Sequence, residues 1–282
     1  MESTPLTFLL LNSLVLFLLL AVPLAALILL HVRRTLLPRR PPSSRSRGQS
    51  SHLLVVLGSG GHTTEMLLIL GTILEPNSLP LASTFRHYIV STGDIRSVRA
   101  AAAFEAEMES RAQEKGWEYA KWWAVSEVPR ARKIHQSLLS APWSCLQCLW
   151  ACVKLLRTQP HKSSSTTALQ EGVNSSYPDL ILTNGPATSC ILLLAACLLR
   201  LLRLPRTAEG MRGIYVESWA RVKSLSLTGK MVLSFGLCER VIVQWAGLEG
   251  QKGWWWVTWL WKGGKNEGSR ERKAELMGWL VT

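Results

Sequence analysis

Short apolar runs alternate with segments of helical character from His52 to Gln244, and this alternation limits the possible folds more than any other feature of the chain. Short apolar runs that end in glycine or polar residues are typical of buried parallel strands. Strands that alternate with helices predict a single α/β domain with an open, mostly parallel sheet of Rossmann type. The expected strands are 52–57, 86–91, 119–125, 179–183, 213–216 and 240–244, and the expected helices are 63–74, 97–115, 142–157 and 187–202.

Polar clusters lie next to several of these runs. Asn184-Gly185-Pro186 and Glu217-Ser218 each follow an expected strand, and Arg130 and Arg132 precede an expected helix. Taken alone, each cluster is typical of a turn or a solvated charged surface. Sheets of this type bind ligands beyond the carboxyl ends of their strands, so the shared position of the clusters favours a cleft for an anionic ligand.

The sharpest polar feature is GSGGHTTE, residues 58–65, between the first expected strand and its helix. Glycines let the backbone turn tightly and approach a ligand, and a helix N-terminus offers free N–H groups to an anion, so phosphate binding is predicted. A purely structural connection between strand and helix stays open as the alternative, and His62 alone reads as a helix-start residue. The dinucleotide fingerprint is excluded because Thr63 replaces its third glycine, and the P-loop pattern is absent.

The N-terminal region contains a run of 28 residues, Ser3–Leu30, without a charged side chain. As a helix it would be roughly 40 Å long, which exceeds the ~30 Å hydrocarbon core of a bilayer. A cleaved signal peptide is the alternative, but its basic residues normally precede a shorter apolar stretch. Here the arginines follow the run, which predicts a lumenal N-terminus and a cytosolic main domain. Residues 1–32 are therefore expected to form a lumenal tip and transmembrane anchor, and residues 33–51 a basic disordered tether.

The net charge of +13 invites a nucleic-acid interpretation, but residues 1–50 carry +5 of it, as six arginines against Glu2. Because this charge lies beside the expected anchor, no nucleic-acid partner is predicted. The cysteines are also informative, since Cys145, Cys148 and Cys152 fall on one face of an expected helix without a second pair for a zinc site. Buried thiols in a reducing compartment are predicted, with no metal and no cofactor.

Six segments, taken in order, resemble one protein family: 53–67 (LLVVLGSGGHTTEML), 85–94, 128–137, 178–189, 213–230 and 240–245. The family is the membrane-anchoring subunit of the eukaryotic UDP-N-acetylglucosamine transferase that adds the second GlcNAc to dolichol-linked oligosaccharide. It is similar to the acceptor-binding N-terminal half of MurG-type GT-B glycosyltransferases, and its donor half is a separate soluble catalytic chain. The resemblance therefore implies a domain at 52–246 that binds GlcNAc-diphosphate-dolichol.

The same resemblance implies a location and a set of roles. The chain would recruit its catalytic partner to the cytosolic face of the endoplasmic reticulum membrane, extending to the nuclear outer membrane, and would be inactive alone. His62 would be the candidate base or orienting group near the acceptor hydroxyl. The residues implied for the diphosphate are Gly58, Ser59, Gly60, Gly61, Thr63 and Thr64, and those implied for the cleft are Glu65, Arg130, Arg132, Asn184, Gly185 and Glu217.

The chain departs from the family at two places. Ala187 stands where the family usually has a second glycine, and Gly247–Arg272 contains GWWWVTWLW, which is too short to span a membrane. Residues 247–272 are interpreted as an insertion, such as a translated intron, within a C-terminal region 247–282 that would otherwise dock the partner. The resemblance resumes at 274–281.

Two functions of other classes stay open. A self-sufficient membrane-tethered nucleotide-dependent enzyme would need a second nucleotide motif or a catalytic set, and neither is visible in the sequence. A non-enzymatic membrane scaffold would not need the GSGGH and NGP clusters. The topology makes a separate prediction, because Asn174 begins a glycosylation sequon that should stay unmodified in a cytosolic loop.

Overall fold

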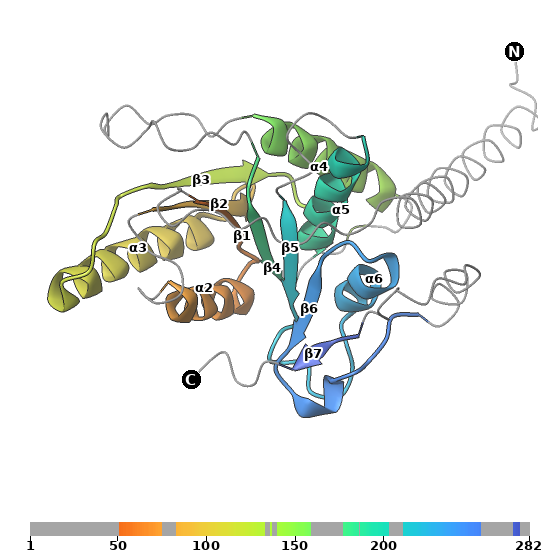
Figure 1. Ribbon diagram of the computed structural model, residues 1–282. Helices are drawn as coiled ribbons and strands as arrows, with labels where there is room; N and C mark the ends of the chain where they lie inside the picture. The colour runs from red at the N-terminus through yellow and green to blue at the C-terminus, as the bar shows by residue number, and fades with distance from the viewer. Residues whose placement is uncertain are drawn as a thin grey trace, which may run out of the picture.

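The computed structural model describes residues 51–74, 83–132, 136, 140–158, 177–185, 187–202, 211–254 and 273–276. Within these ranges the strands form one sheet in the order β3-β2-β1-β4-β5-β6-β7 (Figure 1), and every pairing is parallel. The predicted α/β fold with a parallel Rossmann-type sheet is confirmed. The strands are β1 Ser51–Val56, β2 Thr84–Ser91, β3 Trp123–Val128, β4 Leu180–Asn184, β5 Arg212–Val216, β6 Arg240–Val243 and β7 Glu275–Leu276.

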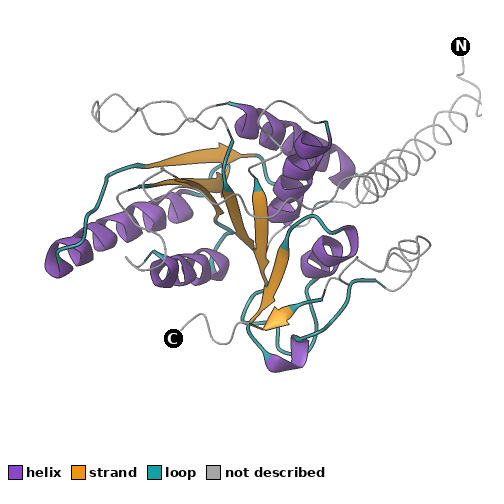
Figure 2. Ribbon diagram, viewed as in Figure 1, coloured by secondary structure: helices purple, strands orange, loops and turns teal. Residues whose placement is uncertain are grey.

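Helices cover both faces of the sheet (Figure 2). One layer holds α2 (Gly61–Ile73) and α3 (Ile95–Lys115), and the other holds α4 (Ala141–Arg157), α5 (Ala187–Leu201) and α6 (Leu227–Phe235). Successive strand residues point to opposite faces, so each face has its own core. In β1, Leu53 and Val55 pack with the α2/α3 layer, whereas Leu54 and Val56 pack with the α4/α5/α6 layer.

The strand order reverses direction beside β1. Its neighbours are β2 on one side and β4 on the other, and the helices that follow β1 and β4 lie on opposite faces of the sheet. A crevice forms at such a switch point, beyond the carboxyl ends of the strands. The loops after β1 and β4 therefore face each other where the sequence predicts a ligand.

One expected strand is displaced. β3 begins at Trp123, which pairs with Arg86, rather than at Tyr119. The preceding residues are held by side chains of α3 and β2 instead, since the Tyr119 hydroxyl donates to the Glu105 carboxylate at 2.7 Å and the Ala120 carbonyl accepts from the Arg86 guanidinium at 3.0 Å. Residues 119–122 thus form a connection that leads into β3 rather than part of the paired strand.

The C-terminal part contains two elements that the sequence did not predict. Helix α6 begins after Ser226, whose hydroxyl accepts from the Gly229 N–H at 2.9 Å. Strand β7 extends the sheet beyond β6, with Ile242 opposite Glu275. The chain therefore returns to the sheet after the stretch interpreted as an insertion. The first residues of that stretch also pack on the domain, because the Trp254 N–H donates to Ser234 at 2.7 Å.

Two further predictions concern the membrane and the cysteines. The expected anchor and tether, residues 1–50, lie outside the described residues, as do the Asn174 loop and residues 255–272. In the ranges that are described, none of the helices combines the length and apolar character needed to cross a bilayer. All six cysteines are free thiols, and five of them are buried, as predicted.

Candidate functional site

The glycine loop after β1 has an open outer side. Gly60 adopts a φ of 66°, in the left-handed region that favours glycine, immediately before α2 begins. A Cβ atom placed on Gly60 or Gly61 would meet nothing within 4 Å, and Ser59, Gly60, Gly61 and Thr64 are exposed. The first N–H groups of a helix lack intrahelical acceptors. An anion can therefore approach the start of α2 without displacing protein atoms.

The inner side of the same loop is fastened by hydroxyl groups. Thr63 is buried, and its hydroxyl donates to the Gly58 carbonyl and lies 2.8 Å from the hydroxyl of Ser97 in α3. Ser97 donates in turn to the Asp94 carboxylate at 2.9 Å. The side chain of Thr63 thus faces the protein interior and holds the shape of the loop, whereas Thr64 faces outward.

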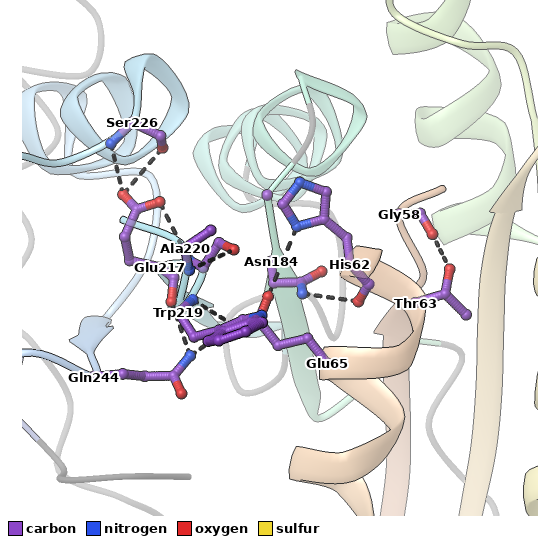
Figure 3. Close-up of polar contacts among 12 residues, drawn as sticks. Gly58, His62, Thr63, Glu65, Asn184, Glu217, Trp219, Ala220, Ser226 and Gln244 are labelled. Atoms are coloured by element: carbon purple, nitrogen blue, oxygen red, sulfur yellow. Dashed lines mark hydrogen bonds and ion pairs between the residues drawn. The ribbon is translucent and has the colours of Figure 1, made fainter. Parts of the chain in front are cut away.

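The loop after β4 meets α2 at His62 (Figure 3). Asn184 is fully buried at the end of β4, and its amide donates to the His62 carbonyl at 2.9 Å. Gly185 has a φ of 63°, and a Cβ atom there would lie 2.5 Å from Nδ1 of His62. Only glycine allows the imidazole to rest against this turn. The GSGGH and NGP clusters, which are more than one hundred residues apart in sequence, are brought together as predicted.

Glu65 connects the imidazole to the other half of the sheet. Its Oε1 accepts from the Trp219 N–H and from the Gln244 amide, both at 2.7 Å, while Oε2 lies 3.8 Å from Nδ1 of His62. Burial by itself would raise the pKa of Glu65, but the adjacent His62 ring and the hydrogen bonds from Trp219 and Gln244 outweigh it and lower the pKa below its ordinary value. The carboxylate is therefore charged at neutral pH beside a half-exposed histidine ring.

Glu217 lies beneath the loop that follows β5 and has almost no exposed surface. Its Oε2 accepts from both the N–H and the hydroxyl of Ser226, at 2.9 and 3.0 Å. Burial raises the pKa of Glu217 in spite of these hydrogen bonds. The carboxylate ties the end of β5 to the start of α6, so its contacts hold the loop between these two elements.

The two predicted arginines approach from the loop after β3. The Ala131 N–H donates at 3.4 Å to the Thr188 hydroxyl, in the first turn of α5, which begins two residues after Gly185. Arg132 is exposed and Arg130 is partly exposed on either side of Ala131. The loop after β5 adds exposed Arg221 and Lys223. Cationic side chains thus lie at the same sheet edge as the glycine loop.

Several buried polar atoms at this edge have no hydrogen-bond partner. Seven such side-chain atoms occur among the described residues, and four of them belong to His62 (Nδ1), Glu65 (Oε2), Asn184 (Oδ1) and Gln244 (Oε1). Unpaired buried polar atoms are rare in proteins, and a catalytic or ligand-binding role is one of the explanations for them. No group of three or more metal-binding side chains is found in the ranges that the structure describes.

Sequence reasoning did not single out two residues that organise the site. Gln244 donates to Glu65 and, at 3.1 Å, to the Glu217 carbonyl, so it joins the two acidic residues. The sequence could have indicated Gln244, because it is the polar residue at the end of an apolar run, as Asn184 is. Trp219 acts through its backbone N–H, and no side-chain pattern in the sequence could have indicated that contact.

Comparison with known proteins places the chain among relatives. A family model described as "Oligosaccharide biosynthesis protein Alg14 like" matches residues 53–260. The "UDP-N-acetylglucosamine transferase subunit alg14" of Aspergillus fumigatus is 39% identical over 210 residues, which are 62% of this chain and 89% of that protein. The corresponding subunits of Schizosaccharomyces pombe and Homo sapiens are 32% and 33% identical, over 80% and 71% of this chain and 88% and 78% of their own lengths.

Proposed function

The chain belongs to the Alg14-like family of oligosaccharide biosynthesis proteins, and on that premise we propose that it is the membrane-anchoring subunit of a UDP-N-acetylglucosamine transferase. In this role it recruits a soluble catalytic subunit to the cytosolic face of the endoplasmic reticulum. It binds GlcNAc-diphosphate-dolichol, and the complex adds the second GlcNAc. Residues 1–32 anchor the chain, residues 33–51 tether the domain, and the C-terminal tail docks the partner.

The observation that carries this proposal is an open glycine loop at the start of α2, on a single sheet. A GT-B glycosyltransferase holds its two substrates between two Rossmann-like domains, and the described residues form one sheet only. The open side of Gly60 and Gly61 suits the diphosphate of a lipid-linked acceptor, because the start of α2 offers N–H groups and a positive helix end. Arg130 and Arg132 add compensating charge at the same edge.

His62 is the proposed base, and Glu65 is the residue that positions it. The carboxylate oxygen nearest the ring faces Nδ1, so the charged carboxylate favours the tautomer with the proton on Nδ1 and leaves Nε2 as the acceptor. Nε2 can then take the proton of the acceptor hydroxyl as that oxygen bonds to the anomeric carbon of the donor sugar, whose bond to UDP breaks. The 3.8 Å separation is long for a hydrogen bond, as is common before substrate binds.

The first test is reconstitution of the full chain with and without its catalytic partner. The substrates are UDP-GlcNAc and a short-chain lipid carrying GlcNAc on a diphosphate. We expect transfer only when both chains are present. Transfer by this chain alone would instead support a self-sufficient enzyme, and no transfer with either preparation would support a scaffold.

The second test is Glu65→Gln in the reconstituted complex. Glutamine keeps an oxygen for Trp219 and Gln244 but presents an N–H group to Nδ1 of His62, which stabilises the wrong tautomer. We expect kcat to fall by about 100-fold or more, with little change in KM for the acceptor. Leu68→Ala, on the exposed side of the same helix, is the matched control. A Glu65→Gln complex with the kcat and pH profile of the wild type would exclude the pair.

The proposed docking tail can be tested by co-purification of the partner. The comparison is between the full chain and a chain that lacks residues 255–272, since residues up to Trp254 pack on α6. If the tail docks the partner and the Trp-rich stretch is an insertion, the shortened chain should retain more of it. Equal retention would remove the effect proposed for the insertion.

A further inference from the structure

Helix α4 exposes large apolar side chains on the side that faces away from the sheet. Trp143 is 68% exposed, Leu146 is 55% exposed and Trp150 is 69% exposed. Their spacing of three and four residues places them in one row. The opposite side of the helix packs in the core through Cys148, Cys152 and Leu156. A helix that needs only one apolar side to join a domain therefore has a second, uncovered one.

The charge on α4 is of one sign. The helix contains no Asp or Glu between Ala141 and Arg157. Lys154 and Arg157 are exposed and continue the row of Trp143, Leu146 and Trp150 toward the C-terminal end of the helix. We call these five side chains the outer face of α4. Indole rings beside lysine and arginine match the boundary between hydrocarbon and anionic headgroups, where the rings sit among lipid and the cations meet phosphate.

The direction of α4 connects the membrane tether with the candidate site. The helix joins two parallel strands, so its basic end lies at the amino edge of the sheet, where the chain enters β1 at Ser51. Its other end lies at the site, since the Ser144 hydroxyl donates to the Ala131 carbonyl at 2.9 Å, between Arg130 and Arg132. The predicted tether before Ser51 reaches at most about 60 Å when extended, which keeps the domain beside the bilayer.

We propose that the outer face of α4 docks the domain onto an anionic lipid bilayer, as a second membrane contact besides the predicted N-terminal anchor. The indoles enter the interfacial layer and the cations contact lipid phosphates. The domain then lies with the loop of Arg130 and Arg132 at the membrane surface, where a lipid-linked diphosphate is presented. This docking is independent of the proposed transferase function, which it would serve by bringing the site to its acceptor.

The test is photolabelling of the full chain by lipid. The chain is reconstituted in phosphatidylcholine vesicles with and without phosphatidylserine, each containing a photoactivatable phosphatidylcholine, and adducts are mapped by peptide mass spectrometry. We expect adducts in 143–157, several-fold more with phosphatidylserine because Lys154 and Arg157 favour anionic headgroups. Adducts in 3–30 serve as the internal reference. Labelled 3–30 with unlabelled 143–157 would overturn the proposal, and so would a lack of dependence on phosphatidylserine.

A double variant, Trp143→Ser with Trp150→Ser, separates docking from folding. Both side chains are mostly exposed, so thermal unfolding should match the wild type, while adducts in 143–157 should fall about tenfold. Ile95→Ser is the matched control, because Ile95 is 62% exposed on α3 in the other layer, and it should change neither quantity. Wild-type labelling of the double variant, or a chemically cross-linked dimer through α4 in place of lipid adducts, would contradict membrane docking. Because this test measures lipid adducts and thermal unfolding rather than transferase activity, its result does not depend on whether the proposed transferase function is correct.

Discussion

The two helical layers bury the sheet in the same way but differ in the surface that they turn outward. Helix α3 exposes acidic and basic residues together, and Arg111 pairs with Glu107 at 2.5 Å. Lys121, which follows this helix, pairs with Glu109 at 2.8 Å. Helix α4 exposes two tryptophans, and all of its charged side chains are cationic. A surface of mixed charge is well solvated by water, whereas a surface of indoles and cations is complementary to a partner that is both apolar and anionic, such as an anionic lipid bilayer.

The layers also differ in the polar groups that they bury. Beneath α3, the guanidinium of Arg86 makes two hydrogen bonds to the Glu105 carboxylate, at 2.7 and 2.8 Å, and Tyr88 and Tyr119 donate to the same carboxylate. On the other face, the buried side chains of His52 and His87 stack with ring centres 5.7 Å apart. The α2/α3 layer thus encloses a compensated ion pair, whereas the other layer buries two histidines that contribute fully to stability only while they are neutral.

The largest effect that this comparison predicts is on the ion pair. Arg86→Met leaves the Glu105 carboxylate buried without its cation, and we expect the free energy of unfolding to fall by about 3–5 kcal/mol. Denaturant unfolding of the detergent-solubilised chain measures it. The double variant Arg86→Met with Glu105→Leu removes both charges and should recover much of the loss. If the single variant were as stable as the double variant, the pair would not be the feature that distinguishes this layer.

A smaller effect is expected from the histidines on the other face. Burial lowers the pKa of His87 from 6.5 in the unfolded chain to about 4. The pKa of His52 falls from 6.5 to about 3, because this side chain is buried and also lies next to His87. Below pH 6.5 these histidines bind protons in the unfolded state but not in the folded state. Their contribution to the free energy of unfolding is therefore fully present above pH 6.5 and declines as the pH falls toward 4 and 3. The slope should be about 1.4 kcal/mol per pH unit for each histidine at most.

The measurement is thermal stability between pH 7 and pH 5. His87→Gln is the informative variant, because an amide can keep the 2.8 Å hydrogen bond to Ser126 without titrating. Its stability should depend less steeply on pH than that of the wild type. Parallel curves for the two proteins would mean that these histidines do not set the pH response of this face.

Much of this architecture could be predicted because the decisive signals are local. The apolar runs predicted the strands from β1 to β6, with β3 placed four residues too early, and the rule that ligands bind beyond strand ends predicted that Asn184 and Gly185 lie at the same sheet edge as His62. Strand β7 was missed because two residues, Glu275 and Leu276, carry no periodic pattern. Helix α6 was missed because its start depends on Ser226 and Glu217, which come together only in the folded chain.

The roles within the site were harder to predict than its place. Glu65 and Glu217 have the same side chain and both lie at the candidate site, yet one has a lowered and the other a raised pKa. The difference comes from Gln244, Trp219 and His62 around Glu65, which are distant in sequence from one another. Likewise Thr63 and Thr64 are neighbours, but helix geometry turns one inward to Gly58 and the other outward.

The smallest expected effect on stability tests the outer face of α4 most directly. Trp150→Glu removes an exposed indole and places an acid four residues before Lys154, an arrangement that stabilises a helix by about 0.2–0.5 kcal/mol. The melting temperature should therefore change by only about 1–2 °C. Lipid adducts on α4 should nevertheless fall in the order wild type, Trp150→Gln, Trp150→Glu, because the first substitution removes the indole and the second also adds a charge that anionic lipid repels. A loss of several degrees would instead show that Trp150 contributes to the fold as a core residue does, and the two layers would then differ in packing rather than in what they face.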